Sequence, residues 1–367
     1  MERQPSKRHI AMLIGALGRG GSERVLVNLS EYFVEQGYQV TMVTQHKREE
    51  EYPLNRQVKR VLSDISQQEE GKSRILNFIK RFRLLRRIWK EEKPDVILSF
   101  IGKNNIMALL TSRFLGIPVA VSVRGEPTEE YYNGILKLLA RHLFILADGI
   151  ILQTRRSMEF FPKAVRKKAV ILKNPVNASF FREPYNGERE KVITAVGRVD
   201  DNKNHELLLR AFAGIAEEFP DYRLVIYGEG ECRAGLTDLA EKLGLSERIA
   251  LPGAVSNVAE AIYKAQIFVL SSNTEGVPNT LIEAMLLGLT VISTDCPCGG
   301  PGELIENGVN GLLVQVGNEQ QMEESLRRVL RDRELAAFLG KNAGSIADSY
   351  RPDVVYESWR RYLDSLM

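Results

Sequence analysis

The chain has 367 residues, of which 44% are hydrophobic and 26% are charged, and its net charge is +3. This composition is typical of a globular protein, and the length exceeds what one hydrophobic core usually supports, so we expect two domains. The three cysteines, Cys232, Cys296 and Cys298, form no C-x-x-C pair, which argues against a disulfide framework and a zinc site. No apolar run approaches a membrane span and the N-terminus lacks a cleavage site, so the sequence predicts a cytoplasmic protein.

The charge is unevenly distributed. Residues 1–183 carry 32 Lys and Arg against 19 Asp and Glu, and the rest of the chain is acidic. Much of the basic excess lies in residues 72–93, KSRILNFIKRFRLLRRIWKEEK, where apolar residues at helical spacing form one face (Ile75, Ile79, Phe82, Leu85 and Trp89). This segment is either a solvated surface helix or a helix that rests on the inner face of an anionic membrane. No nucleic-acid-binding motif accompanies the charge, so nucleic acid is not expected as a partner.

The first predicted strand, HIAMLIGAL, runs into the glycine-rich turn GRGGSER and then into an amphipathic helix. Backbone amides at a helix N-terminus favour an anion such as phosphate, although a purely structural turn is the alternative. Gly21 stands where a P-loop needs lysine, and Glu23 stands where a dinucleotide fingerprint needs its third glycine. The next strand, YQVTMVTQH, lacks the acidic residue that holds a ribose, which disfavours a nicotinamide dehydrogenase.

Short apolar segments alternate with helical ones along the rest of the chain: DVILSF, PVAVSVRG, GIILQT and KAVILKNP, then KVITAVGRV, YRLVIYGEG, IALPGAV, IFVLSS and TVISTD. Turn residues and charges interrupt the alternation at residues 174–190, which predicts a linker. We therefore expect an α/β protein with two doubly wound, Rossmann-like domains, residues 1–182 and 183–349, followed by a helix in residues 350–367. Ligands of such sheets bind at the carboxyl ends of the strands, so a cleft lined by both domains is the expected site.

The most informative segment is SSNTEGVPNTLIEAMLLG. Glu275 precedes the predicted helix and Glu283 lies on its second turn, so both carboxylates can face one ligand. Pro278 suits a first helical turn, and the amides of Asn279, Thr280 and Leu281 are expected to be unpaired there, which offers an anion site. A carboxylate accepts two hydroxyl hydrogen bonds at once, as a sugar or a ribose diol presents.

The run from Glu275 to Glu283 matches E-G-x-P-x-x-x-x-E, and the chain resembles the retaining, GT-B-fold glycosyltransferases of family 4 over essentially its whole length. The other matching stretches are GGSERV, GRVDDNKN, YGEGE, LPGAVSNV and CGGPGELIENGVNGLLV. The chain is most similar to bacterial enzymes that extend lipid-linked oligosaccharides or build exopolysaccharide and O-antigen. The resemblance implies an acceptor-binding N-terminal domain and a donor-binding C-terminal domain that face each other across a cleft, with the last helix packed back on the first domain.

This resemblance also implies a reaction. A hexose or N-acetylhexosamine passes from a nucleotide sugar, with UDP the first choice, to a saccharide or a polyprenyl-diphosphate-linked saccharide. Anomeric configuration is retained, and neither a cofactor nor a metal ion is implied. N-acetylgalactosamine, galactose and glucose donors stay open, as does a GDP-sugar. The alternatives are a sugar-nucleotide epimerase of the same fold and a non-catalytic nucleotide-sugar-binding protein.

Residue roles follow from the matching motifs. Arg198 and Lys203 are implied to bind the donor diphosphate, Glu275 to bind the transferred sugar and Glu283 to bind the ribose. The remaining implied donor contacts are Gly20 and Gly21 at the phosphates, Gly228, Val255 and Asn257 at the base, and the amides of Asn279, Thr280 and Leu281. His205, next to this basic loop, is interpreted as an exposed residue at a helix start rather than a catalyst.

One position departs from the family pattern. Many relatives carry a histidine after the fourth N-terminal strand, where Arg124 stands in this sequence. Arginine stays protonated and cannot act as a general base, so Arg124 is expected to stabilise the leaving phosphate or hold an anionic acceptor. The alternative is a structural arginine that pairs with Glu126 or a neighbouring carboxylate. Acceptor contacts are predicted at the end of another strand, at Lys103, Asn104 and Asn105.

Overall fold

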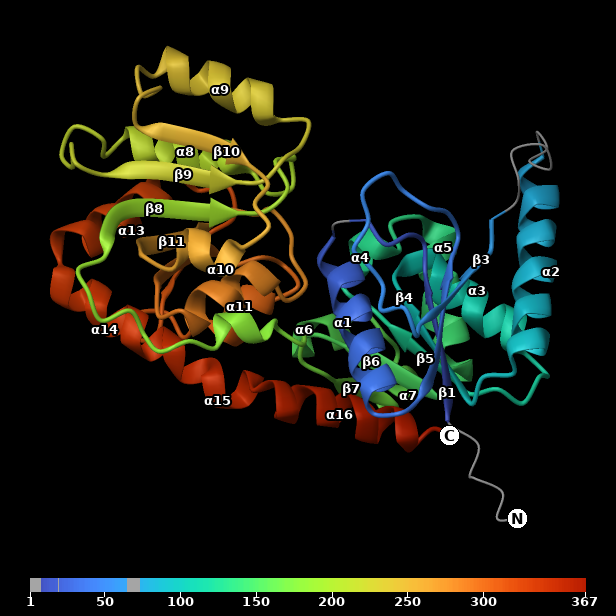
Figure 1. Ribbon diagram of the computed structural model, residues 1–367. Coiled ribbons are helices and arrows are strands. Elements are labelled where there is room, and N and C mark those ends of the chain that lie inside the picture. Colours follow the sequence, from blue (N-terminus) through green and yellow to red (C-terminus); the bar gives the residue numbers. More distant parts are fainter. Residues whose placement is uncertain (1–7, 19, 65–72) are drawn as a thin grey trace. The chain divides into compact units, whose positions relative to one another are not determined.

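The computed structural model describes residues 8–18, 20–64 and 73–367 and divides the chain into two compact units. Unit 1 runs to Pro175 and takes in Asp353–Met367 at the end of the chain, and unit 2 is Val176–Pro352. The division therefore falls before the boundary at residue 182 that the sequence suggested. Each unit is an α/β domain built on a parallel sheet (Figure 1), as predicted.

In its described residues, unit 1 has a seven-stranded parallel sheet in the order β3-β2-β1-β4-β5-β6-β7. The strands are β1 His9–Ile14, β2 Gln39–Thr44, β3 Lys59–Leu62, β4 Val96–Phe100, β5 Val119–Ser122, β6 Gly149–Leu152 and β7 Ala169–Ile171. The helices are α1 Gly21–Glu35, α2 Arg74–Glu92, α3 Gly102–Ser112, α4 Pro127–Glu130, α5 Gly134–Leu143, η1 Phe144–Leu146, α6 Arg155–Met158, α7 Lys163–Arg166 and α16 Pro352–Asp364.

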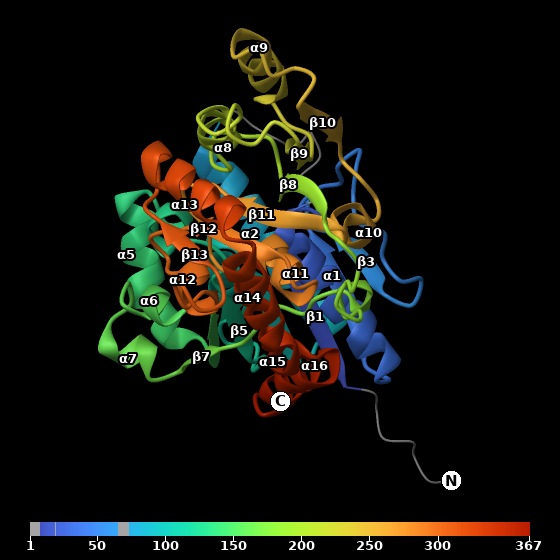
Figure 2. The same cartoon turned by 90° about the vertical axis from the view of Figure 1, so that its left-hand side faces the viewer.

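Strand residues of unit 1 alternate between two buried faces, because successive side chains of a strand point to opposite sides. Ile10 and Met12 of β1 pack with α1 and α16, whereas Ala11 and Leu13 pack with α2, α3 and α5. Figure 2 shows α1 and α5 on opposite sides of this sheet. Both faces are thus covered by helices, which explains the nearly continuous apolar character of these strands.

In its described residues, unit 2 has a six-stranded parallel sheet in the order β10-β9-β8-β11-β12-β13. The strands are β8 Glu190–Val196, β9 Arg223–Tyr227, β10 Ile249–Gly253, β11 Ala265–Leu270, β12 Thr290–Thr294 and β13 Leu312–Val314. The helices are η2 Ala178–Phe180, α8 His205–Ala213, α9 Arg233–Lys242, α10 Val258–Ile262, α11 Asn279–Leu286, α12 Gly300–Leu304, α13 Glu319–Arg331, α14 Arg333–Ala343, η3 Gly344–Ile346 and α15 Ala347–Tyr350.

The C-terminal helix α16 belongs to the core of unit 1. Val355, Trp359 and Leu363 are buried on the same sheet face as α1. Trp359 Nε1 donates to the carbonyl oxygen of Lys173 at 2.8 Å, and Tyr362 Oη accepts from the N–H of Ile150 at 3.0 Å. The last helix therefore completes a domain that begins with the first strand.

Helix α2 is buried only in its second half. Leu85 and Trp89 are 2% and 0% exposed, whereas Ile75 is 72% exposed and Ile79 is 37% exposed. The apolar face predicted for residues 72–93 is therefore split into a packed part and an exposed part; residue 72 itself lies outside the described residues. Over the part of the chain that the structure covers, no helix combines the length and apolarity needed to cross a bilayer.

Candidate functional site

Two loops of unit 2 carry three of the predicted donor-site residues: Arg198, Lys203 and Glu275. Residues 197–204 follow β8, and residues 271–278 follow β11, the strand next to β8 in the sheet. Because the carboxyl ends of parallel neighbours meet at one edge, the two loops lie together. Each loop leads directly into a helix, α8 and α11 respectively.

Three asparagines fasten these loops to each other. Asn202 Oδ1 accepts from the N–H of Thr274 at 3.1 Å, and Asn202 Nδ2 donates to the carbonyl oxygen of Thr274 at 3.0 Å. Asn204 Nδ2 donates to Asn273 Oδ1 at 3.1 Å, and the N–H of Asn273 donates to the carbonyl oxygen of Asn202 at 2.7 Å. We name Asn202, Asn204 and Asn273 the asparagine clamp, since their hydrogen bonds fix one loop relative to the other.

Beside the clamp, Lys203 and Glu275 form a mostly buried ion pair. Lys203 Nζ donates to Glu275 Oε1, and Ser272 Oγ donates to the same oxygen at 2.7 Å. The two side chains are 14% and 15% exposed. An ammonium group and a carboxylate held side by side in this way can bind one ligand that carries both negative charge and hydroxyl groups.

Arg198 lies on the same loop but reaches into solvent. Its side chain is 66% exposed and pairs with Asp200 Oδ2 at 3.0 Å. Asp200 Oδ1 also accepts from the N–H of Lys203 at 2.9 Å, which ties the exposed arginine to the start of the buried pair. Asp200 is only 11% exposed, but the guanidinium itself is open to solvent, so it has room to turn toward an anion.

Glu283 lies on α11 and is 1% exposed among buried apolar neighbours, as its apolar surroundings in the sequence indicated. Asn279 and Thr280, at the start of this helix, are half-buried. The prediction of an unpaired amide at Leu281 is wrong: its N–H donates to the carbonyl oxygen of Pro278 at 3.2 Å. The first turn tightens to a 3₁₀-type bond there, and the Leu281 side chain is fully buried.

Two glycines let the loop backbones touch. A Cβ atom on Gly228, whose φ is +148°, would lie 1.7 Å from the carbonyl oxygen of Gly197. A Cβ atom on Gly300 would lie 1.5 Å from the carbonyl oxygen of Gly276. No side chain fits at either position, so only glycine allows the backbones around residues 197 and 276 to be approached this closely.

Of the predicted base contacts, Gly228 follows β9, whereas Val255 and Asn257 follow β10, the outermost strand on that side of the sheet. Val255 is half-buried and Asn257 is exposed. Asn257 caps α10, since its Oδ1 accepts from the N–H of Glu260 at 3.1 Å. The structure thus gives Asn257 a structural role alongside the implied one.

His205 is buried, so the expectation of an exposed residue is wrong. The residue is 5% exposed, and Nε2 lies 3.2 Å from the carbonyl oxygen of Arg198. Burial, and after it the charge of Lys203, lowers the pKa of His205 to about 4. The imidazole is therefore neutral at physiological pH and anchors the loop that carries Arg198 and Lys203.

The buried imidazole makes stability depend on pH. Its folded-state pKa of about 4 lies below the ordinary 6.5, so between these values the unfolded chain binds the proton and the folded chain does not. We expect the stability of the wild type to fall from pH 6.5 to pH 4 more steeply than that of His205→Asn, by at most about 3 kcal/mol. Urea unfolding of both proteins at a series of pH values measures the difference. Parallel curves would contradict this assignment.

In unit 1, the glycine turn is already in contact with a carboxylate. Gly20 is the N-cap of α1, and a Cβ atom on it would lie 2.2 Å from Glu23 Oε2. Glu23 stands at the third helical position, from which a glutamate commonly reaches back to the cap. Gly20 therefore approaches its own helix closely, and a phosphate at Gly20 and Gly21 would meet the Glu23 carboxylate.

Arg124 is enclosed rather than presented to a ligand. The residue is 6% exposed, and its guanidinium carbon lies 4.8 Å from the ring centre of Phe100 and 5.8 Å from that of Trp359. Its Nη2 donates to Asn174 Oδ1. Burial lowers the pKa of Arg124 to about 9, so it remains charged at neutral pH. This geometry disagrees with a direct catalytic contact and favours the structural alternative, with Asn174 as the partner instead of Glu126.

A half-buried carboxylate that the sequence did not single out, Glu130, ties two loops of unit 1 together. It accepts from the N–H groups of Arg124 and Gly125, both at 2.6 Å, and from that of Gly102 at 3.1 Å. Burial raises the pKa of Glu130, and the three N–H groups act in the opposite direction. The acidic run EPTEE, just after Arg124, was the sequence signal for a carboxylate at this loop. It does not indicate which backbone N–H groups donate to Glu130.

The predicted acceptor residues divide into exposed and buried ones. Lys103 is exposed at the start of α3, and Asn104 Nδ2 donates to the carbonyl oxygen of Phe100 at 3.1 Å. Asn105 is fully buried and its Nδ2 donates to the carbonyl oxygen of Ser122 at 2.9 Å, so the structure gives it a packing role and its acceptor contact stays a prediction. Ile101, between β4 and α3, has φ +71°, a conformation that a β-branched residue rarely adopts.

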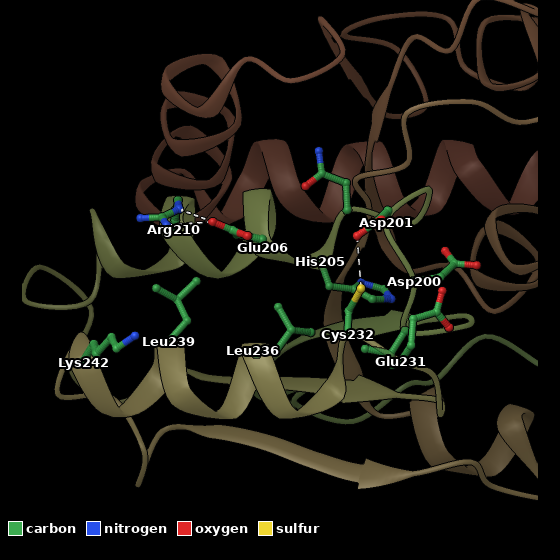
Figure 3. Close-up of a pocket in the computed structure, with 13 residues that line it drawn as sticks. Asp200, Asp201, His205, Glu206, Arg210, Glu231, Cys232, Leu236, Leu239 and Lys242 are labelled. Atoms are coloured by element: carbon green, nitrogen blue, oxygen red, sulfur yellow. Dashed lines mark hydrogen bonds and ion pairs between the residues drawn. The ribbon is translucent and has the colours of Figure 1, made fainter.

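A cavity of about 420 Å³ lies between α8 and α9 of unit 2 (Figure 3). Asp200, Asp201 and Glu231 line one end, and Cys232 Sγ donates to Asp201 Oδ1 at 3.2 Å. Lys203, Glu275 and Glu283 are not among its lining residues. Within residues 8–18, 20–64 and 73–367, no group of three or more His, Cys, Asp or Glu side chains is arranged to hold a metal ion.

The chain matches two protein families in tandem. Residues 19–180 match Glycosyltransferase Family 4, and residues 177–345 match Glycosyl transferases group 1. The protein therefore belongs to the two-domain glycosyltransferases of the GT-B class, and it is a transferase enzyme.

Two curated relatives and one solved structure are similar over nearly their whole length. An α-1,4-N-acetyl-D-galactosaminyltransferase of Campylobacter jejuni, whose name specifies a diphospho-undecaprenol-linked saccharide as substrate, is 28% identical over 96% of this chain and 98% of its own. The amylovoran biosynthesis glycosyltransferase AmsD of Erwinia amylovora is 23% identical over 97% of this chain and 99% of its own. The fold matches that of Anabaena HepE with a TM-score of 0.81 and 16% identity, covering 98% and 100% of the two chains.

Proposed function

We propose that the protein is a retaining glycosyltransferase that moves a hexose or N-acetylhexosamine from a UDP-sugar to a polyprenyl-diphosphate-linked saccharide. The observation that carries this proposal is the Lys203–Glu275 pair at the carboxyl edge of unit 2, held by the asparagine clamp. The named substrate of the Campylobacter relative supports the acceptor class, and the UDP complex of HepE supports the nucleotide.

In this proposal the positive groups of one loop bind the donor diphosphate. Arg198 turns from Asp200 to the phosphates, and Lys203 shares its ammonium between Glu275 and a phosphate oxygen. Glu275 accepts hydrogen bonds from hydroxyls of the transferred sugar, and Glu283 from the ribose. As the bond between the anomeric carbon and the phosphate oxygen breaks, the two cations stabilise the departing diphosphate. The acceptor hydroxyl attacks from the same face and passes its proton to that diphosphate.

Other residues keep their sequence-derived roles as parts of the proposal. Gly228, Val255 and Asn257 would hold the base, and Asn279 and Thr280 would meet the phosphates at the start of α11. Gly20 and Gly21 would contact the same phosphates from unit 1 if Glu23 turns aside. Lys103 and Asn104 would meet the diphosphate of the acceptor, for which an exposed lysine is suited.

The test is nucleotide binding and sugar release by the purified protein and by Glu283→Ala. Isothermal titration with UDP is expected to show affinity about 10- to 100-fold lower for the variant, since hydrogen bonds from the ribose to a carboxylate are lost. A panel of UDP-, GDP- and ADP-sugars, assayed by thermal shift and slow hydrolysis, identifies the donor. Glu283→Gln is the control for packing, because it keeps the shape of the side chain and removes its charge.

The outcomes separate the proposal from its alternatives. Binding of a UDP-sugar without hydrolysis or transfer would identify a nucleotide-sugar-binding protein. Interconversion of one free UDP-sugar into another would identify an epimerase. Equal UDP affinity of the wild type and Glu283→Ala would remove Glu283 from the donor site.

We also propose that transfer needs no added metal ion, because Arg198 and Lys203 supply the positive charge at the diphosphate. Transfer by the purified enzyme is therefore expected to proceed at an unchanged rate in EDTA. Loss of activity in EDTA, with recovery on addition of Mg²⁺ or Mn²⁺, would contradict this part of the proposal.

Finally, we propose that α2 attaches the enzyme to the inner face of the membrane that holds its acceptor. The exposed first turns of α2 present Ile75, Leu76 and Phe78, which are 72%, 56% and 47% exposed. Exposed basic residues, among them Lys80 and Arg83, follow on the same helix. Apolar side chains next to basic ones fit the boundary of an anionic bilayer. Replacing Ile75 and Phe78 by Ser is expected to weaken sedimentation with anionic vesicles.

A further inference from the structure

Two adjacent serines at the end of β11 hold the two loops of the candidate site. Ser271 and Ser272 follow the last residue of this strand and are 1% and 0% exposed. Ser271 Oγ donates to the carbonyl oxygen of Lys203 at 2.9 Å, and Ser272 Oγ donates to Glu275 Oε1 at 2.7 Å. One serine thus holds the backbone that carries the ammonium group, and the other holds the carboxylate itself.

The backbone of Ser272 is in turn fixed by the neighbouring strand. Its carbonyl oxygen accepts from Thr294 Oγ1 at 2.6 Å and from Cys296 Sγ at 3.4 Å, at the end of β12 and just beyond it. All three residues are fully buried. Because close packing leaves a buried side chain few alternative rotamers, the hydroxyl of Ser272 is a donor at a nearly fixed position.

The two oxygens of the Glu275 carboxylate are used differently. Oε1 accepts from both Lys203 Nζ and Ser272 Oγ. Within residues 8–18, 20–64 and 73–367, no hydrogen bond ends on Oε2. Each carboxylate oxygen can accept about two hydrogen bonds, and the side chain is 15% exposed, so Oε2 is the oxygen that is left for a hydroxyl group of a ligand.

We propose that Ser272 is a positioning residue that keeps Glu275 Oε2 directed at the transferred sugar while the donor is bound. This inference rests on the proposed function, in which Lys203 shares its ammonium with the donor diphosphate. The ammonium then binds Oε1 less strongly, and the hydroxyl of Ser272 is the donor that remains on that oxygen. Ser272 is fully buried, so it acts through Glu275 and does not touch the donor.

The test is isothermal titration of the full chain and of Ser272→Ala with UDP, UDP-N-acetylgalactosamine, UDP-galactose and UDP-glucose. Ser272→Ala is expected to bind the tightest of these UDP-sugars about tenfold more weakly than the wild type does, since a hydrogen bond to a charged group is lost. Its affinity for UDP, which lacks the sugar, is expected to be unchanged. A merely structural role of Ser272 would lower both affinities together.

Two further variants make this comparison specific. Ser293→Ala is the matched control, because Ser293 is also fully buried but its Oγ donates to the carbonyl oxygen of Thr294; it is expected to bind every ligand as the wild type does. In a Glu275→Ala background, Ser272→Ala is expected to cause no further loss, since Ser272 acts through that carboxylate. Circular dichroism melting establishes that each variant is folded.

The outcomes separate this inference from the proposed function. A wild type that binds neither UDP nor any of the UDP-sugars contradicts both. If the wild type binds a UDP-sugar and Ser272→Ala binds it equally well, the positioning role is overturned and the transferase proposal stands. An equal loss of affinity for UDP and for the UDP-sugar, or a loss that persists in full in the Glu275→Ala background, also overturns it, because Ser272 would then support the loop rather than the carboxylate.

Discussion

Lys203→Ala is expected to lower kcat/KM for sugar transfer by about 10²- to 10³-fold, the range found when one group that stabilises a developing negative charge is removed. The loss has two physical causes. The departing diphosphate loses a cation, and Glu275, which is 15% exposed, loses the ammonium that pairs with it. Steady-state kinetics with the donor identified by the nucleotide panel gives the measurement.

A matched control distinguishes this effect from the general loss of a lysine. Lys191 of the same unit pairs with Asp221 at 2.7 Å, but its side chain is 41% exposed. Lys191→Ala should leave kcat/KM unchanged, since exposed pairs contribute little. Lys203→Arg should recover only part of the activity, because a guanidinium has a different shape and reach. Wild-type turnover by Lys203→Ala would remove Lys203 from the catalytic site.

Trp359→Ala is expected to lower the free energy of unfolding of unit 1 by about 3–5 kcal/mol, the cost of emptying a large aromatic site in a core. Trp359 is fully buried on the sheet, its Nε1 donates to the carbonyl oxygen of Lys173, and its ring lies against Phe100 and Arg124. Hydrogen exchange in urea, followed on peptides from β4 to β6, reports on unit 1 separately from unit 2.

The same helix supplies the control for this prediction. Val354 of α16 is 45% exposed, so Val354→Ala should change stability by no more than about 0.5 kcal/mol. Similar exchange in Trp359→Ala and Val354→Ala would mean that α16 is not part of the cooperative core. In that case the structural role of Arg124 would also lose its support.

The sequence predicted every strand inside the two sheets and one edge strand of each, β7 and β10, and it missed the other edge strand of each. HIAMLIGAL and IFVLSS are apolar because helices cover both faces of a central strand. The missed strands, β3 Lys59–Leu62 and β13 Leu312–Val314, are the outermost strands of their sheets. KRVL has two basic residues among its four and LLV has only three residues, so neither carries a clear strand pattern; the edge strand β7 was recognised because AVI stands in the longer apolar run AVIL.

The positions of candidate-site residues were predictable where they depend on the spacing of residues along the chain. Glu275 follows β11 and Lys203 follows β8, and these two strands are neighbours, so the contact between the two side chains follows from the sheet. Burial was not predictable in the same way. His205 is covered by its own loop, and Arg124 is enclosed by Trp359 from the far end of the chain; both depend on tertiary packing that local pattern does not encode.

The asparagine clamp has a consequence for engineering. Because Asn202, Asn204 and Asn273 join the loop of Lys203 to the loop of Glu275, the two loops form one hydrogen-bonded block. A graft that exchanges residues 198–205 alone would break these hydrogen bonds and separate the two loops. Replacing either loop in this scaffold therefore requires residues 198–205 and 271–278 to be exchanged as a matched set.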